Sequence, residues 1–312
     1  IFSEYSLDLI IIHSSSAVLG TYDLLLKTQA PIIYVFHSPW SEEYKILNEN
    51  ILTCGNFFAK FAVNFLTWAR KYHEKKYLEL SDGIITLSEY MKNFLTKIHP
   101  SINADKISVI PGGADLSRFH PANNKNEILC IRRKYSLPEN EILLITVRRL
   151  VPRTGVDVLI RSLPHVLQRI NQKIKLIIVG DGPMLPELKE LSEKLNLEDE
   201  ILFTGILNDE TLREYYRASD IFIIPTKYLE GFGLSTVEAI ASGLIVLGTD
   251  IGGTNEILSN ISKNLLISEC SESAIADKII SCLNKQNSFS DELKNKGLDL
   301  IRKIYNWDNH TK

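Results

Sequence analysis

Residues 221–249 read IFIIPTKYLEGFGLSTVEAIASGLIVLGT, and this stretch predicts a strand, a loop, a helix and a second strand. The apolar runs at 221–224 and 245–249 are short and bounded by turn residues, which is typical of parallel strands buried on both faces. Residues 234–241 are predicted to form the helix between them. A strand, a helix and a strand in this order form the unit from which parallel sheets are built.

The same alternation extends outward from this stretch in both directions. In the second half of the chain, strands are predicted at 142–147, 175–179 and 201–204, and helices at 156–170, 183–195 and 210–218. In the first half, strands are predicted at 9–12, 32–36, 84–87 and 108–110, with helices at 16–28, about 42–80, and after Ser88 as the capping residue. Such regular alternation implies doubly wound parallel sheets of the α/β class.

The length of 312 residues is too great for one ordinary core and favours two domains. The polar stretch PANNKNE at 121–127 is the best candidate for a linker, so we expect domains at 1–122 and 123–312. The chain begins with IFSEYSLDLIII, close to a predicted strand and without Met. We interpret this start as an N-terminal domain that lacks its first part.

The composition is that of a soluble globular protein, with 45% hydrophobic and 23% charged residues. A formal net charge of -3 provides no basic field for nucleic acid, so a nucleic-acid partner is not expected. The four cysteines are widely separated and form no CxxC pair, which argues against a zinc site or a disulfide framework. A reducing, cytoplasmic location is therefore expected.

The loops predicted to follow the strands of the second half carry cations and small residues. RRLVPRTG at 148–155 contains Arg148, Arg149 and Arg153, and GDGP at 180–183 contains Gly182. Ligands of such sheets sit beyond the carboxyl ends of the strands, where helices begin. Cations gathered with helix N-termini form an anion site, and a diphosphate is the anion that this arrangement predicts.

Two carboxylates flank the glycines of EGFGLSTVEA. Gly231 and Gly233 allow a ligand to approach the backbone closely. Glu230 lies before the predicted helix and Glu238 lies inside it, so they reach different parts of an extended ligand. A carboxylate accepts paired hydrogen bonds from vicinal hydroxyls, which suits a sugar ring at Glu230 and a ribose at Glu238.

This constellation resembles glycosyltransferase family 4, the retaining enzymes of the GT-B fold. VIPGGADLSRF, RRLVPRTGVDVLI, VGDGP, ILFTG, EGFGLSTVEAIASG and GGTNE occur in that family's order and approximate spacing, and FHSPWSEEY resembles its N-terminal domain. The resemblance extends from about residue 8 to 307. It implies two Rossmann-like domains facing a cleft, with the acceptor on the N-terminal side and the sugar nucleotide on the C-terminal side.

The resemblance also implies roles for matching residues. Arg149 would contact the donor diphosphate, Glu230 the transferred sugar and Glu238 the ribose. His37 would lie near the reacting sugar and the acceptor, and Ile206 would border the base. The backbone of Gly231, Phe232, Gly233 and Leu234 would lie along the sugar and the phosphates.

Two features depart from the family pattern. The family usually has a lysine five residues after its first donor arginine, and Thr154 stands there, so Arg153 or Arg148 is expected to supply the missing charge. From the start at Ile1 we also expect the N-terminal stretch with the family's first strand and glycine-rich loop to be missing. No DxD-like pair stands where a metal would bridge the diphosphate, so we expect neither a metal nor a cofactor beyond the co-substrate donor.

The expected function is transfer of a hexosyl-type sugar from a nucleotide sugar to a glycan, lipid-linked or small-molecule acceptor, in surface polysaccharide or glycolipid synthesis. The departures motivate an alternative, a catalytically weak sugar-nucleotide-binding protein or a subunit that needs a partner. A sugar-nucleotide epimerase of the same fold is a third hypothesis, which the motifs match less well. A dehydrogenase is disfavoured because GDGP is not GxGxxG.

Residues 57–77, FFAKFAVNFLTWARKYHEKKY, mix aromatic and basic side chains. The favoured interpretation is a helix whose aromatic side chains face the core and whose basic face is solvated. The alternative is a helix on a membrane surface, which would bring the protein to the inner face of a membrane and to a lipid-linked acceptor.

Overall fold

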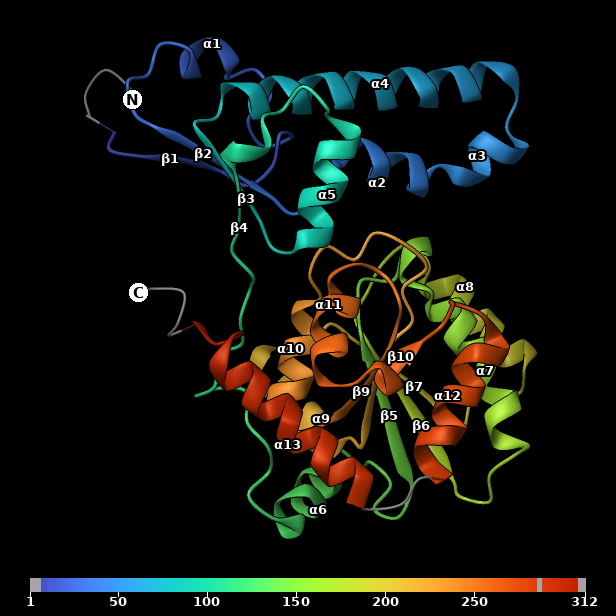
Figure 1. Ribbon diagram of the computed structural model, residues 1–312. Coiled ribbons are helices and arrows are strands. Elements are labelled where there is room, and N and C mark those ends of the chain that lie inside the picture. Colours follow the sequence, from blue (N-terminus) through green and yellow to red (C-terminus); the bar gives the residue numbers. More distant parts are fainter. Residues whose placement is uncertain (1–6, 285–287, 308–312) are drawn as a thin grey trace. The chain divides into compact units, whose positions relative to one another are not determined.

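The computed structural model describes residues 7–284 and 288–307 (Figure 1). The chain divides into two compact units, Ile1–Pro111 and Gly112–Lys312. Each unit is an α/β domain with an entirely parallel sheet among its described strands, as the alternating pattern predicts. The predicted linker, 121–127, lies just after the start of the second unit and overlaps helix α6 (Lys125–Lys134).

The first unit is built on a four-stranded sheet. Its strands follow the order of the chain and are β1 (Ile10–Ile12), β2 (Ile32–Phe36), β3 (Gly83–Thr86) and β4 (Ile107–Val109). The connecting helices are α1 (Tyr22–Leu25), α2 (Trp40–Leu47), α3 (Glu49–Cys54), α4 (Phe57–Leu80) and α5 (Glu89–Ile98). Phe36, Tyr77 and Leu95 are buried together in the core that these elements share.

Two helix predictions in this unit are corrected. Only Tyr22–Leu25 of the expected helix 16–28 is helical, because the chain turns repeatedly before it and passes through Gly20 at a φ of +85°. The expected helix 42–80 is broken twice, and Asn56 starts the longest piece by accepting a hydrogen bond from the Ala59 amide. The capping role of Ser88 is confirmed, since its hydroxyl accepts from the Met91 amide at 3.1 Å.

The second unit contains a six-stranded sheet in the order β10-β9-β8-β5-β6-β7. The strands are β5 (Ile142–Val147), β6 (Ile174–Val179), β7 (Ile201–Gly205), β8 (Ile221–Ile224), β9 (Ile245–Thr249) and β10 (Leu266–Ile267). From β5 the chain runs outward to β7, and then returns to β8 on the other side of β5 and runs outward to β10. The strand order therefore reverses between β5 and β8, which is where doubly wound sheets bind their ligands.

Helices cover both faces of this sheet. Figure 1 shows α7 (Val156–Leu167), α8 (Leu185–Lys194) and α12 (Glu272–Asn284) on one face, and α10 (Leu234–Ala241), α11 (Gly252–Ile261) and α13 (Ser288–Lys303) on the other. Helix α9 (Asp209–Ala218) packs with α6. Because helices lie on both sides, the side chains of Leu143, Leu144 and Ile145 on β5 are all fully buried, which explains the uninterrupted apolar runs of the sequence.

Candidate functional site

The loops that follow β5 and β8 meet at the reversal of strand order. The Lys227 amide donates to the Arg153 carbonyl at 2.9 Å, and the Arg153 guanidinium donates to the Leu229 carbonyl at 2.7 Å. Gly155 has a φ of +71°, and a Cβ there would lie 1.8 Å from the Pro225 carbonyl oxygen. Only glycine permits this approach. The two loops thus form one packed layer at the carboxyl edge of the sheet.

A buried ion pair joins these loops. The guanidinium of Arg148 binds the carboxylate of Glu230, and it also donates to the hydroxyl of Thr226 at 2.6 Å. That hydroxyl in turn donates to Glu230 at 2.9 Å. Burial alone would raise the pKa of Glu230, but the charge and hydrogen bond of Arg148, together with the charge of Arg153 and the hydrogen bond of Thr226, outweigh it and hold the pKa below its ordinary value of 4.5. Glu230 is therefore a carboxylate in a fixed position.

The backbone of Glu230 is also held in place. The preceding residue, Leu229, has a φ of +59°, a conformation that costs free energy for a side chain of this size. The Gly253 amide donates to the Glu230 carbonyl at 2.9 Å, and a Cβ at Gly252 would lie 2.2 Å from the same oxygen. The glycines of the GGTNE motif therefore have a structural role, because they let α11 begin against Glu230.

The three arginines of RRLVPRTG have different environments. Arg148 is buried in the ion pair, and Arg153 is bonded to the Leu229 carbonyl. The side chain of Arg149 is exposed and has no hydrogen bond or ion pair within the described ranges 7–284 and 288–307, whereas its backbone carbonyl accepts from the Thr154 hydroxyl at 3.1 Å. Thr154, at the position where a lysine was expected, is buried and donates its hydroxyl to the Val151 carbonyl at 2.7 Å. Arg149 is thus the most exposed arginine of this loop, and its contact with a diphosphate stays a prediction.

The start of α10 brings backbone amides to the same edge. Gly233 precedes the helix at a φ of +89°, and a Cβ there would approach the Thr254 hydroxyl to 2.9 Å. The first amides of a helix have no partner within the helix and bind anions. Phe232 is buried against Tyr305 at 5.6 Å between ring centroids, whereas Leu234 is exposed. The Phe232 side chain is therefore part of the core, and the contact of its backbone with a ligand stays a prediction.

Glu238 has an environment opposite to that of Glu230. Burial raises its pKa to about 7, and the charge of Asp209 adds to this effect. The Tyr216 hydroxyl donates to Glu238 at 3.2 Å. This hydrogen bond and the charge of Arg118 lower the pKa, but by less than burial and Asp209 raise it. Glu238 is therefore partly protonated near neutral pH. Tyr216 is not among the residues predicted from the sequence, because its position on α9 gives no sign of its contact with α10.

Gly182 and Ile206 extend the site along the sheet edge, after β6 and β7. A Cβ at Gly182 would lie 2.3 Å from the Leu150 carbonyl, so the GDGP turn packs directly on the arginine loop. Ile206 has 79% of its surface exposed and follows Gly205, which has a φ of +69° and open space around it. The predicted site residues of the second unit thus share one edge of its sheet, and their donor contacts stay predictions.

In the first unit, His37 has a partner that the sequence analysis missed. His37 follows β2 and His13 follows the adjacent strand β1, and Nε2 of His37 lies 3.1 Å from Nδ1 of His13. The rings are stacked, with centroids 5.4 Å apart. Burial, and then the charge of His13, lower the pKa of His37. The available signal was that both residues end adjacent parallel strands and so lie at one sheet edge.

Replacing Arg148 and Arg149 in turn separates support of the loops from binding. Arg148→Met should lower the free energy of unfolding in urea by about 3–5 kcal/mol, because it leaves the Glu230 carboxylate buried without its cation. The matched change Arg149→Met should alter stability by less than about 0.5 kcal/mol. It should instead weaken calorimetric binding of a nucleoside diphosphate by about 1.5–3 kcal/mol. Equal stability of the two variants would contradict this assignment.

The ionisation of Glu238 predicts a pH dependence of nucleotide binding. Its pKa is raised to about 7, so the carboxylate, which is predicted to accept ribose hydroxyls, predominates above that pH and is lost below it. Between pH 8 and pH 6 affinity should fall roughly tenfold, the change in the ionised fraction. Calorimetry on Glu238→Gln is the control, since titration of the nucleotide phosphates affects both proteins alike. If the nucleotide affinities of the parent chain and of Glu238→Gln changed in parallel with pH, a contact between Glu238 and the ribose would be excluded.

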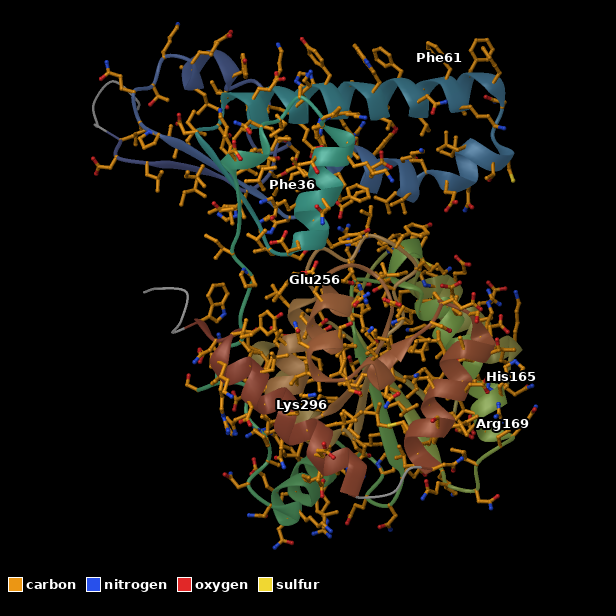
Figure 2. The ribbon with its side chains drawn as sticks, in the orientation of Figure 1. Phe36, Phe61, His165, Arg169, Glu256 and Lys296 are labelled. Atoms are coloured by element: carbon orange, nitrogen blue, oxygen red, sulfur yellow. The ribbon has the colours of Figure 1, made fainter. Side chains whose placement is uncertain are left out.

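The histidine pair predicts a measurable titration. The nuclear magnetic resonance midpoint of His37 should lie below 6.5, so His37 is neutral at physiological pH. His13→Gln should raise that midpoint, because it removes a neighbouring charge. His165, which Figure 2 labels on α7 of the second unit, gives the control, and His165→Gln should leave His37 unchanged. If the titration midpoint of His37 were the same in His13→Gln as in the parent chain, the contact with His13 would have no influence on the pKa of His37.

Comparisons with known proteins bear on the family of the chain. The glycosyl transferases group 1 family matches residues 128–299, and glycosyltransferase family 4 matches residues 1–118. The alpha-monoglucosyldiacylglycerol synthase of Streptococcus pneumoniae is 27% identical over 265 residues, which is 83% of this chain and 56% of that protein. The chain spans between about half and three fifths of the length of the curated relatives that it matches first.

Solved structures share the fold. Sucrose-phosphate synthase from Thermosynechococcus elongatus has a TM-score of 0.81 at 23% identity, over 99% of this chain and 72% of that one. Anabaena HepE in complex with UDP has a TM-score of 0.76 at 19% identity, over 97% of this chain and 76% of that one. These neighbours show the GT-B arrangement of two parallel-sheet domains. With a family match over more than half of its residues, the chain belongs to the group 1 glycosyl transferases, the family 4 enzymes that its motifs resemble.

Proposed function

We propose that this glycosyltransferase moves a hexosyl-type sugar, with retention of configuration, from a nucleotide-sugar donor to a glycan, lipid-linked or small-molecule acceptor. The single observation that supports it most is the convergence of Arg149, Glu230 and the start of α10 at the point where the strand order reverses. The HepE complex with UDP supports a nucleotide donor, and the alpha-monoglucosyldiacylglycerol synthase relative supports a role in glycolipid synthesis, which we propose together with surface polysaccharide synthesis as the alternative.

The chemistry assigned to this edge is stabilisation of the leaving diphosphate. As the glycosidic bond breaks, negative charge grows on the phosphate oxygens, and Arg149 together with the first amides of α10 is placed to receive it. Fixed donors of this kind need no reorganisation during the reaction. We therefore expect transfer without a metal ion.

Glu230 orients the transferred sugar in this proposal. Its carboxylate accepts hydrogen bonds from sugar hydroxyls, and the pairing with Arg148 keeps it from adding an uncompensated negative charge beside the diphosphate. Glu238 binds the ribose from its separate position on α10. The neutral imidazole of His37, held by His13, would serve the acceptor side.

A cytoplasmic location is proposed as well. All four cysteines are free thiols, as they are in proteins of a reducing compartment. A lipid-linked acceptor would place the site of action at the inner face of a membrane.

The decisive experiment measures release of nucleoside diphosphate from UDP-, GDP- and ADP-sugars by the full chain, with and without diacylglycerol or glycan acceptors. One donor should be turned over in the presence of EDTA. Glu230→Gln should lower turnover by about 10²–10³ while nucleotide affinity stays within a few-fold, because the contact is to the sugar. Glu190→Gln, an exposed residue paired with Lys194 on α8, is the control and should keep full activity.

Three results would count against the proposal. Unchanged turnover in Glu230→Gln would remove that residue from the sugar site. A requirement for manganese or magnesium would mean that the diphosphate is neutralised by a metal. Binding of nucleotide without turnover of any donor would indicate a binding protein in place of an enzyme.

A further inference from the structure

Helix α4 exposes most of its aromatic side chains, which contradicts the prediction that they face the core. The exposed fractions are 77% for Phe57, 81% for Phe58, 64% for Phe61, 53% for Phe65, 60% for Trp68 and 46% for Tyr72. These six residues are called the aromatic face. A contiguous exposed apolar surface of this kind marks an interaction site.

The aromatic face lies opposite to the side by which α4 packs. Phe61, Phe65, Trp68 and Tyr72 follow a spacing of four, three and four residues, so they form one row along the helix. The buried residues Val63, Glu74, Tyr77 and Leu78 form another row, about half a turn away. Figure 2 shows Phe61 pointing away from the side of α4 on which α2 and α3 lie.

The rings of this face support one another. Trp68 stacks on Tyr72 with centroids 5.8 Å apart and an angle of 15° between the rings, and Phe65 lies 5.9 Å from Trp68. Glu74, the first acidic residue of the helix, is buried on the packed side, where it accepts from the Trp40 amide at 2.9 Å and meets His99 at 3.1 Å. The orientation of α4 is therefore determined by the packed side, and the aromatic face is left to solvent.

The charges beside the aromatic face are positive. No acidic residue occurs from 57 to 73, and Lys71 is exposed without an ion pair in the described part of the chain. Lys76 lies over the ring of Tyr72, 5.1 Å from its centroid. Lys75 pairs with Glu79 at the end of the helix. The face thus offers apolar rings with cations along its C-terminal half.

We propose that the aromatic face of α4 docks on an anionic lipid surface, with the helix lying in the plane of the interface. Phenyl and indole rings partition into the boundary between head groups and acyl chains, while lysines beside them bind anionic head groups. A second copy of the chain fits the aromatic face less well than a lipid surface does. Residues 57–73 of that copy would bring the same cations and no acidic residue to pair with them. None of the helices in the described parts of the chain has the length and hydropathy to cross a bilayer.

This inference goes beyond the proposed transfer reaction and does not depend on it. Binding to lipid is measured without donor or acceptor, so a failure of catalysis and a failure of docking give separate results.

The test is flotation of the full chain with vesicles of phosphatidylcholine alone, and with phosphatidylglycerol as about a third of the lipid. The chain should float with the anionic vesicles. The triple change Phe61→Ser, Phe65→Ser, Trp68→Ser should lower partitioning at least about tenfold. Lys71→Ser with Lys76→Ser should remove the dependence on phosphatidylglycerol. All three aromatic positions are exposed, so unfolding midpoints should stay unchanged.

The matched control is Leu24→Ser with Leu47→Ser, which removes two apolar side chains of similar exposure, 50% and 49%, that lie outside the aromatic face. It should float like the parent chain. Flotation of the triple variant at the parent level would overturn the proposal. The proposal would also be overturned if the parent chain did not float with vesicles but formed a dimer in sedimentation, and if the triple change abolished that dimer.

Discussion

The buried ion pair between Arg148 and Glu230 is the interaction on which the site of this glycosyltransferase depends. It connects the loop after β5 to the loop after β8, the two adjacent strands between which the order of the sheet reverses. A buried carboxylate is tolerated only with a partner charge and hydrogen bonds, and Arg148 and Thr226 supply both. The strained Leu229 and the glycine-lined start of α11 adjoin Glu230 and hold its backbone in place.

The pair also explains why adjacent arginines have different tasks. The alternation of side chains near a strand end sends Arg148 into the protein and leaves Arg149 exposed. The buried arginine neutralises Glu230, and the exposed one takes no part in that ion pair. Thr154 closes the loop on itself with a hydrogen bond to Val151, and therefore a lysine is not needed there for the loop to fold.

Two carboxylates of one motif differ in ionisation because their surroundings differ. Glu230 has a guanidinium in contact and keeps a pKa below the ordinary range, whereas Glu238 has a phenol and a nearby aspartate, and burial raises its pKa. Environments that separate the pKa values of two acids are a common sign of distinct roles in one site. Fixed charge at Glu230 and adjustable charge at Glu238 suit a sugar contact and a ribose contact in turn.

The histidine pair and the aromatic face lie in different parts of the first unit. Its histidine pair lies at the carboxyl edge of the sheet, where His13 and His37 end adjacent strands. Its aromatic face belongs to α4 and points away from α2, α3 and the sheet. The narrow packed side of α4, around Val63 and Tyr77, leaves the wider aromatic face exposed among residues 7–111, the described part of this unit.

The sequence by itself determined the elements that are buried on all sides. β8, α10 and β9 begin and end where residues 221–249 predict, because buried parallel strands need uninterrupted apolar runs and their loops need glycine or polar residues. It also placed the arginines, Glu230 and Glu238 at one sheet edge. Only the tertiary structure decided which arginine is buried, how Glu238 meets Tyr216, and that the aromatic side chains of α4 face outward. Those outcomes depend on contacts between segments far apart in the chain, and local periodicity specifies which residues share a face but not what that face will meet.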